Sequence, residues 1–238
     1  MAYIYAGVVA LATILGGLLP FTRVFKKMNN IFLVAFAAGA MLGIAFFDLI
    51  PEAAELEANL YWIGVGFLFV YILERFFALH AHADEHEHLP HVSKSAGLVS
   101  LIGVVLESLI DGIAIAVGVA IEPVLGIAIA AAVLVHEIPR GFTTAVIINS
   151  LGYKKIVVAL ALAVDALFTI FGVALGNIFP QQYFPHLIAF AAGVFLFVGG
   201  GDLLPPAHRK TRWSVILTAI AGAVLIYIVT LVVHTYLE

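Results

Sequence analysis

The stretch Val135-His136-Glu137-Ile138-Pro139-Arg140-Gly141 decides how the rest of this sequence is interpreted. It lies inside an otherwise apolar run from Leu125 to Ile148. A histidine, a carboxylate and a guanidinium therefore occupy the middle of a segment that has the length of a membrane helix. Ionisable side chains at bilayer depth are costly and are usually functional. We expect them to have polar partners elsewhere in the chain.

The composition is that of an integral membrane protein. Of the 238 residues, 63% are hydrophobic and 11% are charged, and the mean hydropathy is +1.14. A soluble domain is about half apolar and about a quarter charged. The chain has no cysteine, so metal ligands have to come from His, Asp, Glu, Met or neutral oxygen atoms. No nucleic-acid-binding or phosphate-binding motif is present.

Eight apolar segments have the length of a transmembrane helix, and the connections between them are short. The expected fold is therefore all-α, with a single transmembrane domain over residues 1–238. The predicted spans are residues 3–22, 31–53, 60–80, 95–121, 124–149, 155–179, 185–206 and 213–236.

Lysine and arginine residues flank alternate connections, and Arg140 is the one basic residue that belongs to no connection. The opposite connections carry glutamates such as Glu52 and Glu122. The positive-inside rule then predicts extracytoplasmic termini and a cytoplasmic loop at residues 80–94. The expected location is the inner or plasma membrane, with the chain crossing the lipid bilayer several times.

Spans two and seven contain the same pattern. Phe36-Ala37-Ala38-Gly39 precedes Asp48-Leu49-Ile50-Pro51, and Phe190-Ala191-Ala192-Gly193 precedes Asp202-Leu203-Leu204-Pro205 at the same spacing. The two spans cross the membrane in opposite directions, which predicts an inverted repeat of three, two and three helices. Such repeats are common in secondary transporters that have a site at the membrane midplane.

Span four supplies partners for the opening motif. Glu107 and Asp111 are four positions apart and share one helix face, which Ser108 adjoins. Only a short turn joins spans four and five, so Asp111 and His136 are expected at similar depths on antiparallel neighbours. Two carboxylates and an imidazole, with Glu137 beside them, form a ligand set that suits a divalent first-row metal.

Other residues are candidates for the same chemistry. Asp165 in span six is either a ligand or a structural hydrogen-bonding group, and Met41 in span two either adds a thioether or only packs. The linker after span three is either a flexible polar loop or a weak metal-capture segment. Its histidines are His80, His82, His86, His88 and His91.

These motifs resemble the ZIP (Zrt/Irt-like protein) family of divalent metal transporters, of the prokaryotic type. His136-Glu137-Ile138-Pro139-Arg140-Gly141 is similar to the family's span-five pattern His-Glu-Ile-Pro-Glu/His-Gly. Glu107-Ser108-Leu109-Ile110-Asp111-Gly112 is similar to the span-four pattern His-Asn-x-x-Asp/Glu-Gly, and Asp165 matches an acidic position in span six. The resemblance covers almost the whole chain. It implies a homodimeric carrier that moves a divalent metal toward the cytoplasm by alternating access.

Three residues depart from the family pattern. Glu107 replaces a histidine, Ser108 replaces an asparagine, and Arg140 stands where the family has a Glu or His that can bridge two metals. A guanidinium stays protonated and cannot be a ligand. We therefore expect Arg140 to substitute for one metal and to pair with Asp165 or Glu137.

A single metal site then remains. Its expected ligands are Glu107, Asp111 and His136, with Glu137, Ser108, Asp165 or Met41 as further candidates. Zinc is the first expected substrate, and Fe, Mn, Co and Cd stay open. The metal is a substrate and not a cofactor.

Two alternatives remain. If Arg140 closes the pathway, the chain is a transport-impaired relative that binds or senses metal. An intramembrane metalloenzyme is the other alternative, because His136-Glu137 begins the zinc motif His-Glu-x-x-His. That motif needs a second histidine where Arg140 stands, so the chain is not expected to be an enzyme.

Overall fold

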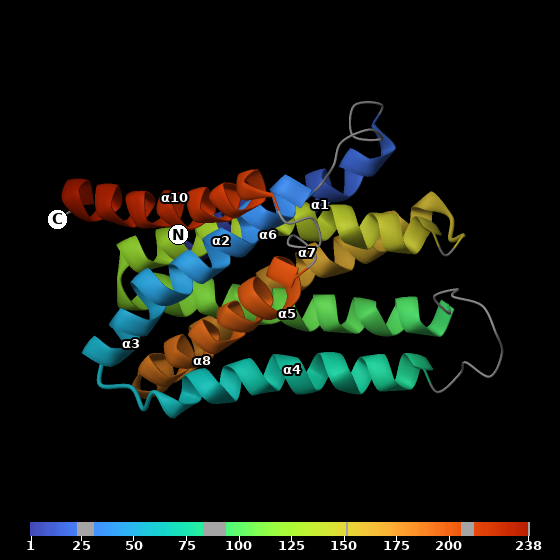
Figure 1. The fold of residues 1–238 in the computed structure, drawn as a ribbon. Helices are drawn as coiled ribbons and strands as arrows, with labels where there is room; N and C mark the ends of the chain where they lie inside the picture. Colours follow the sequence, from blue (N-terminus) through green and yellow to red (C-terminus); the bar gives the residue numbers. More distant parts are fainter. Residues whose placement is uncertain (23–30, 83–93, 151, 206–211, 238) are drawn as a thin grey trace.

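The computed structural model describes the chain apart from residues 23–30, 83–93, 151, 206–211 and 238. In this part of the chain every element is a helix, as predicted, and the long helices pack into one bundle (Figure 1). The elements are α1 (Ala2–Leu18), η1 (Leu19–Phe21), α2 (Ile31–Ile44), η3 (Ala45–Leu49), α3 (Ile50–Glu55), α4 (Tyr61–His82), α5 (Lys94–Ile121), α6 (Pro123–Ser150), α7 (Lys155–Ile178), η4 (Gln181–Tyr183), α8 (Phe184–Leu196), η5 (Phe197–Leu203) and α10 (Trp213–Leu237).

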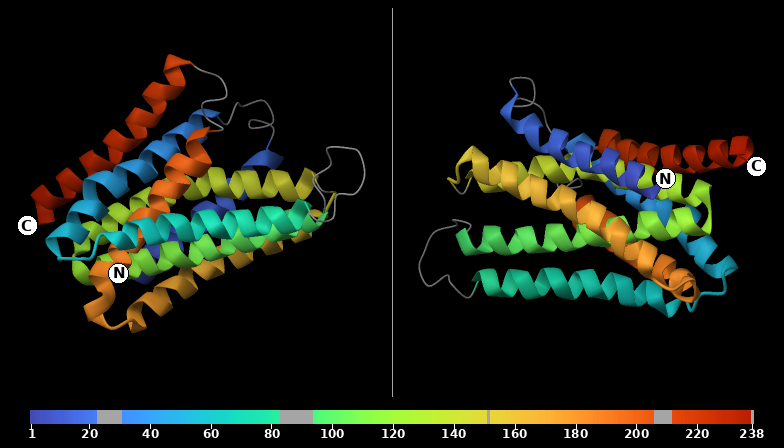
Figure 2. Two further views of the ribbon diagram at one scale, coloured as in Figure 1. Left: turned by 60° about the horizontal axis from the view of Figure 1, so that its bottom comes forward. Right: turned by 180° about the vertical axis from the view of Figure 1, so that it is seen from behind.

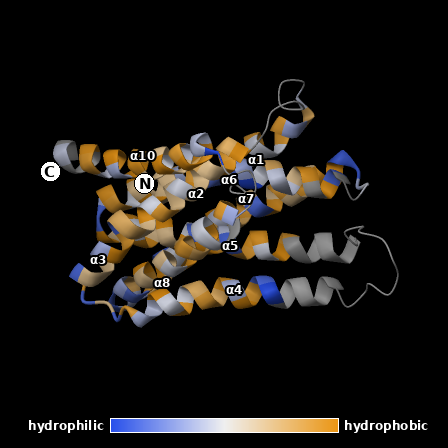
Figure 3. Ribbon diagram, viewed as in Figure 1, coloured by the Kyte–Doolittle hydropathy of each residue, from blue (hydrophilic) through white to orange (hydrophobic). Residues whose placement is uncertain are grey.

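Within the described chain, seven helical segments are long and apolar enough to cross a membrane. Apolar residues cover most of each helix, and polar residues gather at ends such as that of α3 (Figure 3). The remaining predicted span, residues 60–80, corresponds to α4, which is not among the seven but packs against α8 and α5. Seven of the eight predicted spans are therefore matched by such a segment.

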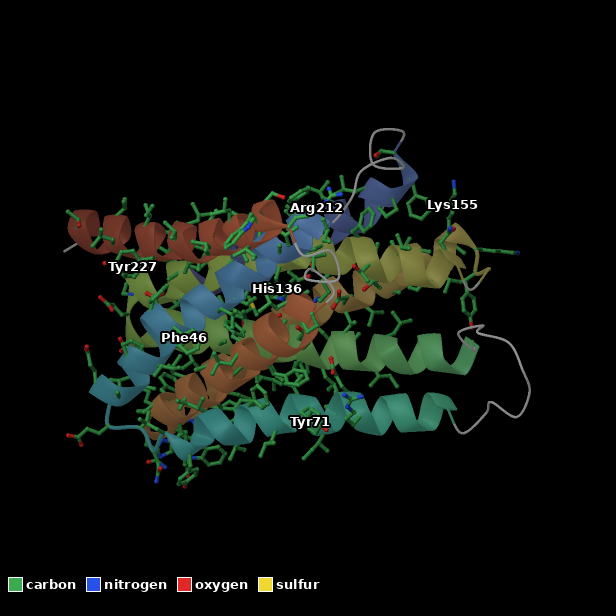
Figure 4. All side chains as sticks on the ribbon, in the orientation of Figure 1. Phe46, Tyr71, His136, Lys155, Arg212 and Tyr227 are labelled. Carbon is green, nitrogen blue, oxygen red and sulfur yellow. The ribbon has the colours of Figure 1, made fainter. Side chains whose placement is uncertain are left out.

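The ends of the bundle are distinct. Both termini lie toward one end, together with the junction of α5 and α6 (Figures 1 and 2). The ends of α4 and α5 that flank residues 83–93 lie at the other end, as does Lys155 at the start of α7 (Figure 4). The helices thus run back and forth between two ends, one of which carries the turn with Lys154 and Lys155.

Glycines allow α2 and α10 to touch backbone to backbone. A Cβ atom at Gly39 would overlap the carbonyl oxygen of Ala219, and a Cβ atom at Gly222 would overlap that of Phe36. Small residues at such crossings are typical of membrane helices, because they let the helix axes approach closely.

The crossing of α4 with α8 has the same reciprocal contact. A Cβ atom at Gly193 would overlap the carbonyl oxygen of Ile63, and a Cβ atom at Gly66 would overlap that of Phe190. Phe190 and Gly193 are the residues that match Phe36 and Gly39 in the sequence repeat. The repeated residues therefore make matching contacts.

The two repeated spans also share a departure from α-helical geometry. Residues 31–53 and 185–206 were predicted as continuous spans, but π-helical segments interrupt both, η3 at Asp48 and η5 at Asp202. A proline follows each aspartate by three positions and lacks the N–H that would close an α-helical bond. Wide π turns are often found at functional sites.

Candidate metal site

α1 crosses α6 at the motif His136-Glu137-Ile138-Pro139-Arg140-Gly141. A Cβ atom at Gly16 would overlap the carbonyl oxygen of Ile138, and one at Gly141 would overlap that of Thr13. This approach brings the Thr13 side chain to α6, where its Oγ1 donates a hydrogen bond to Oε2 of Glu137 at 2.6 Å. Both side chains are fully buried.

α5 crosses α7 in a similar manner. A Cβ atom at Gly112 would overlap the carbonyl oxygen of Thr169 and would also meet Gly172. At this crossing the Ser108 hydroxyl donates a hydrogen bond to Oδ1 of Asp165. Asp165 of span six thus contacts the polar face of span four.

The polar faces of α5 and α6 meet, as the short turn predicted. Nε2 of His136 lies 3.4 Å from Oδ2 of Asp111 and 3.3 Å from Nη1 of Arg140. Nε2 thus faces a donor, the guanidinium, and an acceptor, the carboxylate of Asp111, while Nδ1 lies 3.4 Å from the carbonyl oxygen of Ala132. In the tautomer with the proton on Nδ1, the Nε2 lone pair is directed into the cluster, as a metal-binding histidine requires.

Arg140 reaches α5 through Nη1. This nitrogen lies 3.2 Å from Oδ2 of Asp111 and 3.5 Å from Oε2 of Glu107. Glu107 and Asp111 share one helix face, and one nitrogen of Arg140 lies within 4 Å of both carboxylates.

Arg140 reaches the other acids through Nη2. This nitrogen donates to Oε1 of Glu137 and to Oγ of Ser108, and lies 3.5 Å from Oδ1 of Asp165. The sequence offered Asp165 or Glu137 as the partner of Arg140, and the structure brings both to the same nitrogen. Only 9% of Arg140 is exposed, so these interactions are hardly screened by water.

The cluster keeps unused oxygen atoms. Among the described residues, Oδ1 of Asp111 and Oδ2 of Asp165 are buried without a hydrogen-bond partner. A buried carboxylate oxygen without a donor or cation is unfavourable. The acids therefore have capacity for a further positive group.

Three of the predicted residues have the proximity that a metal site needs. Asp111, His136 and Glu137 each offer a ligand atom, and these atoms lie within 4.8 Å of one another. All three side chains are buried. Their role as metal ligands remains a prediction.

Met41 and the linker histidines are the candidates that these contacts do not include. Met41 is fully buried in α2 and packs against Gly199 of η5, and its role as a ligand stays a prediction. The backbone of His80 and His82 lies in the last turn of α4. The side chains of these two histidines lie outside the described residues, and so do His86, His88 and His91 in full.

Thr13 is the residue that the sequence analysis missed. The signal is a second, shorter repeat: Thr13 precedes Gly16 by three positions in span one, and Thr169 precedes Gly172 by three positions in span six. A threonine in an apolar helix is easily interpreted as packing. Its contact with Glu137 depends on how closely α1 approaches α6.

Fold and site together define a multi-pass membrane protein with a buried charged cluster at its centre, where His136 lies (Figure 4). The family model of ZIP zinc transporters matches residues 79–233, which is more than half of the chain, and the chain belongs to this family. None of the characterised proteins that were compared with the chain is similar enough to count as a match. The family consists of divalent metal transporters and not of enzymes.

Proposed function

We propose that this protein moves a divalent metal ion, zinc first, toward the cytoplasm through a mononuclear site between α5 and α6. The observation that carries the proposal is the Arg140 guanidinium, which lies within 4 Å of all four acids of the cluster. The proposed ligands are Glu107, Asp111 and His136, with Ser108, Glu137, Asp165 and Met41 as further candidates.

Repulsion between Arg140 and the metal ions favours one metal over two. Glu107, Asp111, Glu137 and Asp165 carry four negative charges when ionised, and Arg140 offsets one of them. One dication leaves a net charge of −1 and two leave +1, so the repulsion between the cations decides and not the net charge. Unit charges 4 Å apart repel by about 4 kcal/mol at an effective dielectric constant near 20, and a dication doubles this.

The repeated helix crossings support a 3+2+3 inverted repeat in this chain. The proposed ligands other than Met41 lie on α5, α6 and α7. α1 crosses α6, and α7 crosses α5, each through direct backbone contacts at glycines. Alternating access is then a movement of one repeat-derived bundle against the other around the site, as in other inverted-repeat carriers.

The basic residues support the proposed orientation. We place the turn with Lys154 and the loop at residues 80–94 in the cytoplasm, and both termini outside, in the inner or plasma membrane. The single transmembrane domain covers residues 1–238. A homodimer is the assembly that the family resemblance favours.

Zinc flux and stoichiometry test the site. The purified chain is reconstituted into proteoliposomes, and zinc entry is compared for the native protein, Asp111→Asn and empty liposomes. We expect flux for the native protein alone, and one zinc per chain in equilibrium dialysis. Native flux equal to that of empty liposomes would contradict the transport proposal, and two zinc ions per chain would contradict the mononuclear site.

The orientation has a separate test. The chain has no cysteine, so Glu122→Cys and Lys154→Cys each introduce a unique thiol. We expect a membrane-impermeant maleimide to label Glu122→Cys in intact cells and Lys154→Cys only after the cells are opened. The reverse pattern would contradict the proposed orientation.

A further inference from the structure

The Thr13 hydroxyl joins α1 to the charged cluster. Its Oγ1 lies 2.6 Å from Oε2 of Glu137 and 3.2 Å from the carbonyl oxygen of Val9. A hydroxyl has one proton to donate, and a carboxylate at the shorter distance is the stronger acceptor. Thr13 therefore donates to Glu137.

Glu137 is consequently engaged at both oxygen atoms. Oε2 accepts from Thr13 on α1, and Oε1 accepts from Nη2 of Arg140 one turn along α6. These two bonds fix the orientation of the carboxylate, and a rotation away from it would weaken one or both of them. Asp111 differs, because its Oδ1 has no hydrogen-bond partner among the described residues.

We propose that Thr13 is a positioning residue of the transport site, which holds Glu137 on Arg140 as the counterion of the guanidinium and so leaves Glu107, Asp111 and His136 to bind the metal. This inference rests on the proposed function. It assigns Glu137 to Arg140, although its ligand atom lies within 4.8 Å of those of Asp111 and His136.

Thr13 affects metal binding indirectly, through Glu137 and Arg140. When Glu137 is not held by Thr13, it holds the guanidinium less firmly. Nη1 of Arg140 already lies 3.2 Å from Oδ2 of Asp111. A guanidinium released from Glu137 moves closer to Asp111 and competes with the metal for that carboxylate.

Thr169 provides a matched control. It faces Gly112 of α5 as Thr13 faces Gly141 of α6. Thr169 is equally buried, but its hydroxyl has no hydrogen-bond partner in the described part of the chain. Valine has nearly the shape of threonine, so both substitutions preserve the packing. Only Thr13→Val removes a hydrogen bond to Glu137.

Zinc affinity of the full chain in detergent, measured by competition with a chromogenic chelator, tests the proposal. We expect Thr13→Val to weaken zinc binding by about tenfold or more, as loss of an outer partner of a metal site does. Thr13→Ser keeps the hydroxyl, so its affinity stays within about twofold of the native value, as does that of Thr169→Val.

A double-mutant cycle with Glu137→Gln asks whether Thr13 acts through Glu137. If it does, adding Thr13→Val to Glu137→Gln changes the affinity by less than about twofold. The proposal is overturned if the effects of the two substitutions in the cycle are independent. It is also overturned if Thr13→Val and Thr169→Val lose the same affinity, or if Thr13→Ser does not keep the native affinity.

The remaining outcomes are also decisive. The melting temperature of each metal-free variant shows whether it folds, and Thr13→Ala replaces Thr13→Val if the valine variant does not. If a folded Thr13→Val or Thr13→Ala variant binds zinc with native affinity, the role of Thr13 is overturned and the proposed function is not. A native chain that binds no zinc overturns the proposed function, and the role of Thr13 with it.

Discussion

The crossing of α1 with α6 and the crossing of α5 with α7 have the same backbone contact and different chemistry. Thr13 lies over Gly141 as Thr169 lies over Gly112. On the first crossing the threonine hydroxyl bonds to Glu137, and on the second the hydroxyl has no partner among the described residues. The backbone contacts are repeated, but the polar bonds are not.

The residues next to these glycines differ in charge. Arg140 precedes Gly141 and Asp111 precedes Gly112, so a cation and an anion stand at corresponding places and meet at 3.2 Å. The small residues therefore fix how closely the helices cross at the site. The polar side chains next to the glycines then determine what the site can bind.

The largest expected effect comes from the cation. Arg140→Met keeps a long side chain but leaves three buried acids, and the partly exposed Glu107, without their shared partner. Loss of one partner from a buried charge pair costs about 3–5 kcal/mol, so we expect the free energy of unfolding of the metal-free protein to fall by about that amount. Thermal unfolding in detergent measures the loss, and zinc should restore part of it.

Lys154→Met is the matched control, because it removes an exposed cation from the turn before α7. Its effect should stay within about 0.5 kcal/mol. A metal-free Arg140→Met protein as stable as this control would mean that Arg140 is not the counterion of the cluster.

The next effect tests whether the two crossings are equivalent. Gly141→Ala and Gly112→Ala each place a Cβ atom against a threonine carbonyl oxygen. Overpacking of this kind costs about 1–3 kcal/mol, and we expect similar losses from both variants in thermal unfolding. Gly7→Ala in α1 is the control, because nothing lies within 4 Å of its added Cβ atom. A loss in only one of the two crossing variants would contradict their equivalence.

A third effect tests Asp165, an acid of α7 that has an apolar residue at the corresponding position of α1. Asp165 stands four positions before Thr169, and Val9 stands four positions before Thr13. We expect Asp165→Asn to weaken zinc binding by about tenfold, because the neutral amide leaves Arg140 to compete more strongly for Asp111. Chelator competition measures the change. The exposed Glu55→Gln should change the affinity less than about twofold, and equal effects would remove Asp165 from the site.

Much of the helix pattern follows from the sequence, because length and hydropathy constrain membrane helices strongly. The approach of Asp111 to His136 was also predictable, since a short turn fixes the relative depth of adjacent helices. The π-helical segments at Asp48 and Asp202 were not predicted. They are local changes of hydrogen bonding that leave the apolar character of a span unaltered.

The meeting of the polar faces of α5 and α6 was predictable, and the individual contacts of Arg140 were less so. The sequence offered Glu137 or Asp165 to Arg140, but a guanidinium has several donors, and both acids reach Nη2. Thr13 was missed because its role depends on the close crossing at Gly16 and Gly141. A crossing distance between helices far apart in the sequence has no direct sequence signal.

The smallest expected effect separates packing from charge at the second crossing. Ser108 accepts a hydrogen bond from Arg140 and donates one to Asp165, without adding a charge of its own. Ser108→Ala should therefore lower the free energy of unfolding by about 1 kcal/mol, the usual net value of a buried hydrogen bond. The number of zinc ions per chain should stay at one, since Arg140 still meets Asp165 directly at 3.5 Å. A second bound zinc in this variant would show that the hydroxyl, and not the charge of Arg140, excludes the second metal.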